Sequence, residues 1–196
     1  MSRKLISGVG INDSNYVVKP KVNGKQVECK FYSVWRNMIR RCYSDICKEK
    51  NPTYSNCTVA PEWHSFMMFK SWMEKQDWQG NHLDKDLLVL GSREYGPDTC
   101  IFISPLVNSF IVDKRNRGVW WDKKHAKYAA ASSDIETDSK RIWLGYFETQ
   151  HDARIAYLKH KTKMARKLAV YQTDAVIASA ILRKYEIEME EAECKL

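Results

Sequence analysis

The chain has 196 residues, of which 44% are hydrophobic and 12% aromatic, enough to bury a core and to exclude a mainly disordered protein. Its 32 Lys and Arg outnumber its 24 Asp and Glu, and the formal charge of +8 favours a polyanionic partner. Residues 1–112 hold 15 basic and 11 acidic residues, residues 113–170 hold 14 and 7, and residues 171–196 hold 3 and 6. The positive charge is therefore concentrated in the middle segment, as expected of a face that binds nucleic acid.

Six cysteines occur without a signal peptide or an apolar run near the ~18 residues that a membrane span needs. This predicts a protein of the reducing cytoplasm, with no membrane partner. No C-x-x-C pair is present. Two interpretations stay open: small buried side chains, which are favoured, or convergence of Cys42, Cys57 and Cys100 around zinc.

The first predicted elements are a hairpin and two helices. Alternating runs flank Asn23-Gly24 within residues 16–32, which predicts a β-hairpin that covers one end of the core. An apolar stripe at helical spacing begins at Ser33, and Pro61 opens a second helix whose dense aromatic residues are mostly core. On the first helix, three arginines fall outside the apolar stripe: Arg36, Arg40 and Arg41. They either contact phosphate or form a solvated helix face.

A ββα unit is predicted next, in residues 82–110. It consists of a strand at Leu83–Leu90, a strand at Cys100–Ser104 and a short helix opened by Ser104-Pro105. Polar residues fall at both ends of this unit, Asp84 and Asp86 in the first strand and Asn108 in the helix. If folding brings these oxygens together, they form a hard site of the kind that Mg²⁺ prefers.

These residues carry a resemblance to a known family. The runs YSVWRNMIRRCYS, NPTYSNCTVAPEW, LDKD and YGPDTCIFISPLVN occur in order over residues ~30–112. Together they resemble phage-encoded proteins of the HNH endonuclease superfamily, especially relatives of intron-homing enzymes. The resemblance implies a double-stranded DNA endonuclease or nickase that depends on Mg²⁺ or Mn²⁺.

The resemblance also implies roles for individual residues. It places the metal ligands at Asp84 and Asn108, Lys85 where the family has its general-base His, and Thr99 where it has an orienting Asn. A protonated Lys cannot accept a proton, so Lys85 is expected to neutralise a phosphate instead. Side chains two apart in a strand share a face, so His82 can face the metal with Asp84 and is the candidate base.

A second module follows. Residues 117–121, 126–133 and 140–147 read as three short strands. Thr149 and Asp152 match a capping box that opens a helix. We expect a three-stranded antiparallel sheet packed on that helix, with Trp121 and Tyr128 buried between them.

This run resembles the DNA-binding domain of plant ethylene-response factors, the Apetala-two type, over residues ~115–168. The resemblance implies that the sheet enters the major groove and that base and backbone contacts come from Arg117, Arg141 and Trp143. Trp120 stands where the plant pattern has an Arg, while Ala131 and Ser133 replace its Glu and Arg. Phosphate contacts are expected from three lysines near the first turn: Lys123, Lys124 and Lys127.

The last segment begins as an amphipathic helix and ends acidic, and it either packs back on the core or pairs with a second chain to form a homodimer. The predicted organisation is therefore α+β with three parts: a hairpin plus HNH-like domain at 1–112, an Apetala-two-like domain at 113–170, and the C-terminal helix at 171–196. The leading function is a DNA endonuclease or nickase with an altered metal site. Its competitor is a catalytically inactive DNA-binding regulator or host-interaction factor with the same fold.

Overall fold

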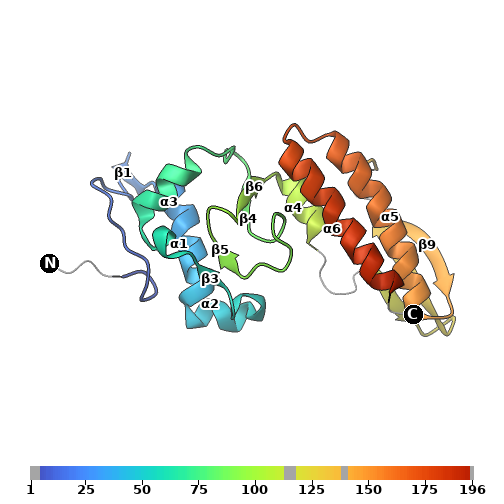
Figure 1. Ribbon diagram of the computed structural model, residues 1–196. Helices are drawn as coiled ribbons and strands as arrows, with labels where there is room; N and C mark the ends of the chain where they lie inside the picture. The colour runs from blue at the N-terminus through green and yellow to red at the C-terminus, as the bar shows by residue number, and fades with distance from the viewer. Residues whose placement is uncertain (1–4, 113–117, 138–140, 195–196) are drawn as a thin grey trace. The chain divides into compact units, whose positions relative to one another are not determined.

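The structure is a computed structural model that describes residues 5–112, 118–137 and 141–194. It has the predicted α+β class and forms two compact units, Met1–Pro105 and Leu106–Leu196 (Figure 1). The predicted divisions fall after residues 112 and 170, whereas the observed division falls at the start of the short helix after Ser104. Within the described ranges, no helix is long and apolar enough to cross a membrane.

The first unit is built on an aromatic core between two helices. Trp35 is fully buried and its Nε1 donates a hydrogen bond to the Trp63 carbonyl at 2.7 Å, which joins the first helix to the turn before α3. The predicted helix after Pro61 begins only at Phe66, because Ser65 caps it by accepting from the Met68 amide. The elements are β1 (Lys21–Val22), β2 (Lys25–Gln26), α1 (Lys30–Tyr43), α2 (Asp45–Lys50), η1 (Pro52–Tyr54), β3 (Thr58–Val59), η2 (Pro61–His64), α3 (Phe66–Met73), β4 (His82–Asp84), β5 (Glu94–Tyr95) and β6 (Ile101–Ile103).

Two predictions in this unit are wrong in detail. The strand expected at Leu83–Leu90 ends at Asp84, because the Asp84 carboxylate accepts hydrogen bonds from the Asp86 and Leu87 amides and turns the chain. The β1–β2 hairpin forms at Asn23-Gly24 as expected, but it does not cover the core, since residues 20–27 are all exposed. The β4–β6 pairing and the short helix after Ser104 are confirmed.

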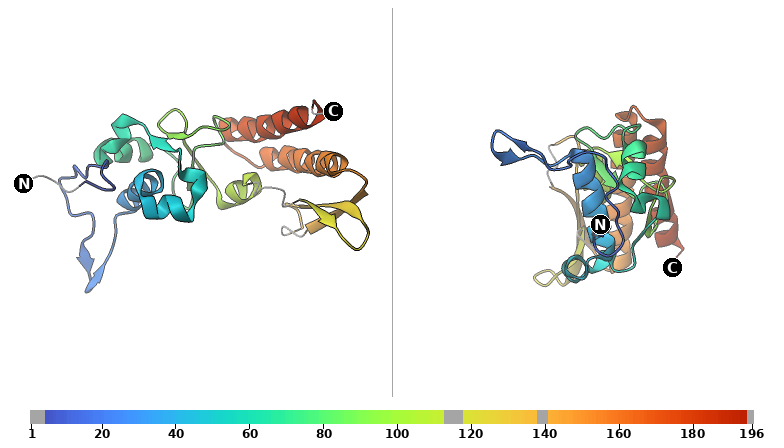
Figure 2. Two further views of the ribbon diagram at one scale, coloured as in Figure 1. Left: turned by 90° about the horizontal axis from the view of Figure 1, so that it is seen from below. Right: turned by 90° about the vertical axis from the view of Figure 1, so that its left-hand side faces the viewer.

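The second unit is layered, with the sheet on one side of α5 and α6 on the other (Figure 2). The sheet is antiparallel in the order β7-β8-β9, as predicted. Thr149 caps α5 by accepting a hydrogen bond from the Asp152 amide at 3.0 Å, which confirms the predicted start of the helix. Its hydroxyl also donates to the Asp152 carboxylate, at 2.7 Å. The elements are α4 (Pro105–Ile111), β7 (Val119–Asp122), β8 (Lys127–Ser133), β9 (Arg141–Phe147), α5 (Gln150–Val170) and α6 (Ala175–Glu193).

Helix α6 packs back against α5, which is the first of the two predicted alternatives; pairing with a second chain stays a prediction. A buried polar contact that the sequence did not reveal holds α4 to these helices. Lys161 of α5 and Tyr185 of α6 both donate to the Phe110 carbonyl, at 2.7 and 3.0 Å. The Lys161 ammonium also lies 3.7 Å from the centre of the Phe110 ring. Helix α4 is therefore fixed within the second unit.

Candidate nucleic-acid interface

The β7-β8-β9 sheet has one face against α5 and one face open. Val119 and Ala130 pair across β7 and β8 and are buried with Ala153, Tyr157 and Leu158 of α5. Side chains alternate along a strand, so the neighbours of the buried residues point outward. The outer face is thus fixed by the register of the sheet.

A β-bulge determines which residues of β9 reach the outer face. Ala131 pairs with Trp143 and Ala130 with Gly145, so Leu144 is the extra residue. Without it, Trp143 and Tyr146 would point to opposite faces, because they are three residues apart. The bulge brings both onto the outer face. Gly145 takes a φ of +131°, which favours glycine over residues with a side chain.

The outer face is aromatic and exposed. Trp120 and Trp143 meet edge to face with ring centres 5.9 Å apart, and Trp143 meets Tyr146 at 4.8 Å. These rings are 38%, 50% and 40% exposed respectively. The Arg141 guanidinium lies 4.8 Å from the centre of the Trp120 ring, which orients its charge over the same face. We call these four residues the outer aromatic face.

The middle strand makes room for these rings. Ala129 pairs with Trp120 and with Tyr146, and Ala131 pairs with Trp143. Both alanines are almost completely buried although they lie on the open face of the sheet. Because a methyl group is small, the aromatic side chains from both edge strands cover it. The small side chain at Ala131 therefore leaves room for the Trp143 ring on this face.

A hydrogen-bonded turn borders this face. Asp122 accepts from the Lys124 and His125 amides through Oδ1 and from the Tyr146 hydroxyl through Oδ2, at 2.9, 3.1 and 3.1 Å. The His125 ring lies 4.5 Å from that of Tyr146. Desolvation raises the pKa of Asp122, but the hydrogen bonds outweigh it and lower the pKa overall. His125 and Tyr146 were not predicted as part of this surface, because strand alternation does not indicate the bulge that turns Tyr146 outward.

The predicted lysines fall at the same end of the sheet. Lys123 and Lys124 lie exposed in the turn between β7 and β8, where they can contact a polyanion. The Lys127 ammonium is 2.6 Å from the Glu148 carboxylate, which offsets part of its charge. Arg117 lies outside the described residues.

One expected core residue is placed differently. Trp121 points to the helix side of the sheet by alternation, yet it is 48% exposed and packs on the Tyr128 ring at 4.9 Å. It lies near the end of an edge strand, where α5 does not cover it. The prediction that Trp121 is buried was wrong, whereas Tyr128 is half-buried and contributes to the core.

The predicted metal site is divided between the units. Asp84 and His82 lie on β4 of the first unit, and Asn108 lies on α4 of the second. His82 is exposed at the start of its strand. Burial raises the pKa of Asp84, and two backbone amides lower it by smaller amounts. In the described part of the chain, no group of three or more His, Cys, Asp or Glu is placed to hold a metal ion.

Lys85 donates hydrogen bonds to the loop that follows it. It is only 7% exposed, and its ammonium donates to the Asp86 carboxylate at 2.5 Å and to the Ser92 carbonyl at 2.6 Å. Thr99 is used in the same way, because its hydroxyl donates to the Glu94 carbonyl and accepts from the Gly96 amide. Both side chains therefore close the loop between β4 and β6.

The three central cysteines are buried in the core of the first unit. Burial raises the pKa of Cys42 and Cys100 to about 12, so both are neutral thiols. This agrees with the favoured interpretation, small buried side chains.

The chain was compared with protein-family models, with curated proteins and with solved structures, and it matches none of them.

Proposed function

We propose that this protein binds double-stranded DNA through the outer aromatic face of β7-β8-β9. The observation that carries the proposal is the exposure of Trp120, Trp143 and Tyr146 in one contiguous surface, with Arg141 held over it. Contiguous exposed aromatic surface indicates an interaction site, since a fold has no need of it. Its basic border indicates a polyanion as the partner.

The arginine on this face supports a duplex as the target. A major groove about 12 Å wide admits an α-helix or a two-stranded β-ribbon, and arginine makes the commonest specific base contact there. Arg141 and Trp143 would contact bases and sugars, while Lys123 and Lys124 would contact phosphates. Base contacts give sequence preference, whereas phosphate contacts give affinity that falls with salt. The resemblance to the Apetala-two type agrees with this assignment.

A second candidate function, DNA cleavage, is favoured by one observation. The β4–β6 hairpin is followed directly by α4, which is the element order that the HNH resemblance implies. On this proposal Asp84 would hold Mg²⁺ or Mn²⁺ and His82 would act as the base, as the resemblance implies, whereas the expected second ligand, Asn108, belongs to the other unit. The cation would supply stabilisation of the charge on the scissile phosphate. The hydrogen bonds of Lys85 favour a role in shaping the loop over a direct role in catalysis.

Two assays on the full chain test these functions separately. Binding to labelled duplexes is measured by anisotropy for the wild type and for the Arg141→Ala, Trp143→Ala double variant. If the double variant loses binding to duplexes of all sequences tested, the proposal is supported. If its binding is unchanged, the proposal is contradicted. Nicking of supercoiled plasmid in Mg²⁺ or Mn²⁺ is measured for the wild type, Asp84→Ala and Asn108→Ala. Salt-sensitive binding with no cleavage would leave the non-catalytic regulator as the function.

A further inference from the structure

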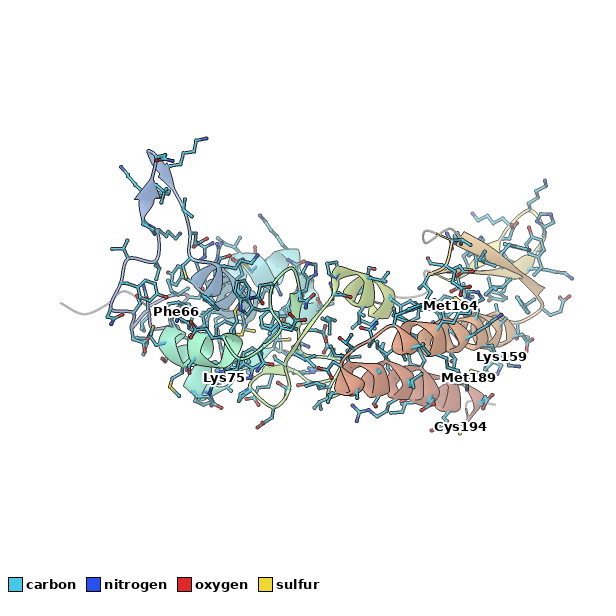
Figure 3. The ribbon with its side chains drawn as sticks, turned by 90° about the horizontal axis from the view of Figure 1, so that it is seen from above. Phe66, Lys75, Lys159, Met164, Met189 and Cys194 are labelled. Carbon is cyan, nitrogen blue, oxygen red and sulfur yellow. The ribbon has the colours of Figure 1, made fainter. Side chains whose placement is uncertain are left out.

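The β1–β2 hairpin stands apart from the packed part of the first unit. Residues 20–27 are all exposed, and the hairpin projects away from α1 and α3 (Figures 2 and 3). Because these residues bury little apolar surface, packing does not explain why the chain forms an ordered hairpin here. The conformation of the turn and the backbone hydrogen bonds explain it.

The hairpin is shaped by its turn and its ladder. Asn23 and Gly24 have φ values of +50° and +77°, as a type I′ turn requires. Below the strands, the Val27 amide donates to the Pro20 carbonyl at 2.9 Å and the Cys29 amide to the Val18 carbonyl at 2.8 Å. The turn and these hydrogen bonds hold the two strands in register.

The root of the hairpin is fixed to the first unit. Val18 and Cys29 pack against its hydrophobic core. The Glu28 carboxylate is 3.1 Å from the Lys19 ammonium and 2.9 Å from the Arg36 guanidinium, so it joins both strands to α1. This ion-pair network also offsets the charge of Arg36, one of the arginines considered for phosphate contact. A fixed root and an exposed tip are the features of a contact element.

The tip carries positive charge on both faces. No acidic residue occurs between Asp13 and Glu28. Lys21 pairs with Gln26 and Val22 pairs with Lys25. Residues directly opposite one another share a face, and neighbours along a strand do not, so Lys21 and Lys25 lie on opposite faces of the ribbon.

We infer that the β1–β2 hairpin is a second DNA-contacting element, which enters a groove of the duplex with Lys21 and Lys25 on the phosphates of its two walls. A groove has phosphates on both sides, which matches a ribbon with one lysine on each face. With Asn23 added to β1 and Gly24 to β2, each arm of the hairpin tip has three residues. At about 3.3 Å per residue, such an arm reaches roughly 10 Å, comparable with a major-groove depth of about 8.5 Å. The inference rests on the proposed function for its ligand, duplex DNA.

The composition of the tip favours nucleic acid over other anionic surfaces. Its polar residues beside the lysines are Asn23 and Gln26, whose amides can donate to and accept from base edges. Its apolar residues are valines, and the segment 17–28 contains no Trp, Phe or Leu of the kind that inserts into a lipid surface.

The test measures how duplex affinity falls with salt for the full chain and for Lys21→Gln, Lys25→Gln. Each phosphate contact contributes about 0.9 to the slope of log K against log salt, so the slope is expected to fall by about 1.8. The matched control, Lys159→Gln with Lys163→Gln, removes the same charge from exposed positions on α5 and is expected to leave the slope unchanged. A photo-crosslinker at Asn23 is expected to label DNA, and one at exposed Glu186 of α6 is not.

An unchanged slope in the hairpin variant, with no crosslink from Asn23, overturns the inference. Equal losses in the hairpin and control variants overturn it as well, because total charge would then explain the effect. These outcomes are distinct from failure of the proposed function, which is tested at Arg141 and Trp143. If the wild type binds no duplex at all, both are contradicted.

Discussion

The outer aromatic face and the loop after β4 differ in what the fold does with their chemically distinctive residues. In the loop, Lys85 and Thr99 donate hydrogen bonds to backbone carbonyls of the loop itself. On the sheet, the bulge after Trp143 turns a further aromatic ring outward and leaves it exposed. Residues that the fold uses internally are weak candidates for contact with a partner. Residues that the fold holds in the open are stronger ones.

The largest expected effect tests whether the outer face depends on tight packing behind it. A Cβ at Gly118 would lie 2.0 Å from two ring carbons of Tyr157, so Gly118→Ala forces the sheet away from α5. We expect a loss of more than about 3 kcal/mol in the free energy of unfolding of the second unit. Chemical denaturation measures this loss, with Tyr157→Ala added to relieve the clash. No loss in the single variant would contradict the packing.

A smaller effect tests the internal role of Lys85. Lys85→Met leaves the Ser92 carbonyl without this donor, which should lower the free energy of unfolding of the first unit by about 1–3 kcal/mol. Duplex affinity should not change, because the sheet is untouched. Anisotropy measures the duplex affinity and chemical denaturation measures the free energy of unfolding, both on the same sample. Weaker binding at unchanged stability would show instead that Lys85 contacts phosphate.

The charged border of the face gives a further test. Lys123→Gln with Lys124→Gln should reduce the salt slope of duplex binding by about 1.8, with equal loss of affinity for all sequences. The two side chains are exposed, so the free energy of unfolding should be unchanged. Anisotropy against a panel of duplexes measures both quantities. A loss confined to particular sequences would mean that these lysines read bases.

The smallest effect concerns pH. Desolvation of the partly buried imidazole lowers the pKa of His160, the nearby Asp134 raises it, and three lysines lower it further. The unfolded chain therefore binds a proton at a higher pH than the folded one, so stability is lost as pH falls through 6.5 and below. His160→Gln should flatten this dependence in thermal unfolding between pH 5 and 7.5. The same pH dependence in the wild type and in His160→Gln would contradict this assignment.

Much of the fold follows from local sequence signals. Asn23-Gly24, the Thr149 N-cap and the alternation in β7, β8 and β9 each determine an element through local interactions, and each is found. One incorrect prediction, the length of the first strand of the ββα unit, has a different cause. The strand after Asp84 has a suitable apolar pattern, but a side-chain to backbone hydrogen bond ends it.

The candidate site was predicted only in part, for a similar reason. Arg141, Trp143 and Trp120 follow from the strand pattern, but Tyr146 joins them only because of a bulge that alternation does not indicate. Trp121 was expected to be buried, since the pattern gives its face but not the extent of helix that covers it. Tertiary coverage is not encoded in the spacing of residues along one strand.

The most direct test of the central claim compares two tryptophans on the edge strands of the same sheet. Trp143 and Trp121 are about equally exposed, at 50% and 48%, but they lie on opposite faces of the sheet. Duplex affinity of the full chain is measured by anisotropy for Trp143→Ala and Trp121→Ala. If the outer face binds DNA, Trp143→Ala weakens binding roughly 10–100-fold, about 1–3 kcal/mol, and Trp121→Ala leaves it unchanged. Equal effects, or a larger one for Trp121→Ala, would contradict the account.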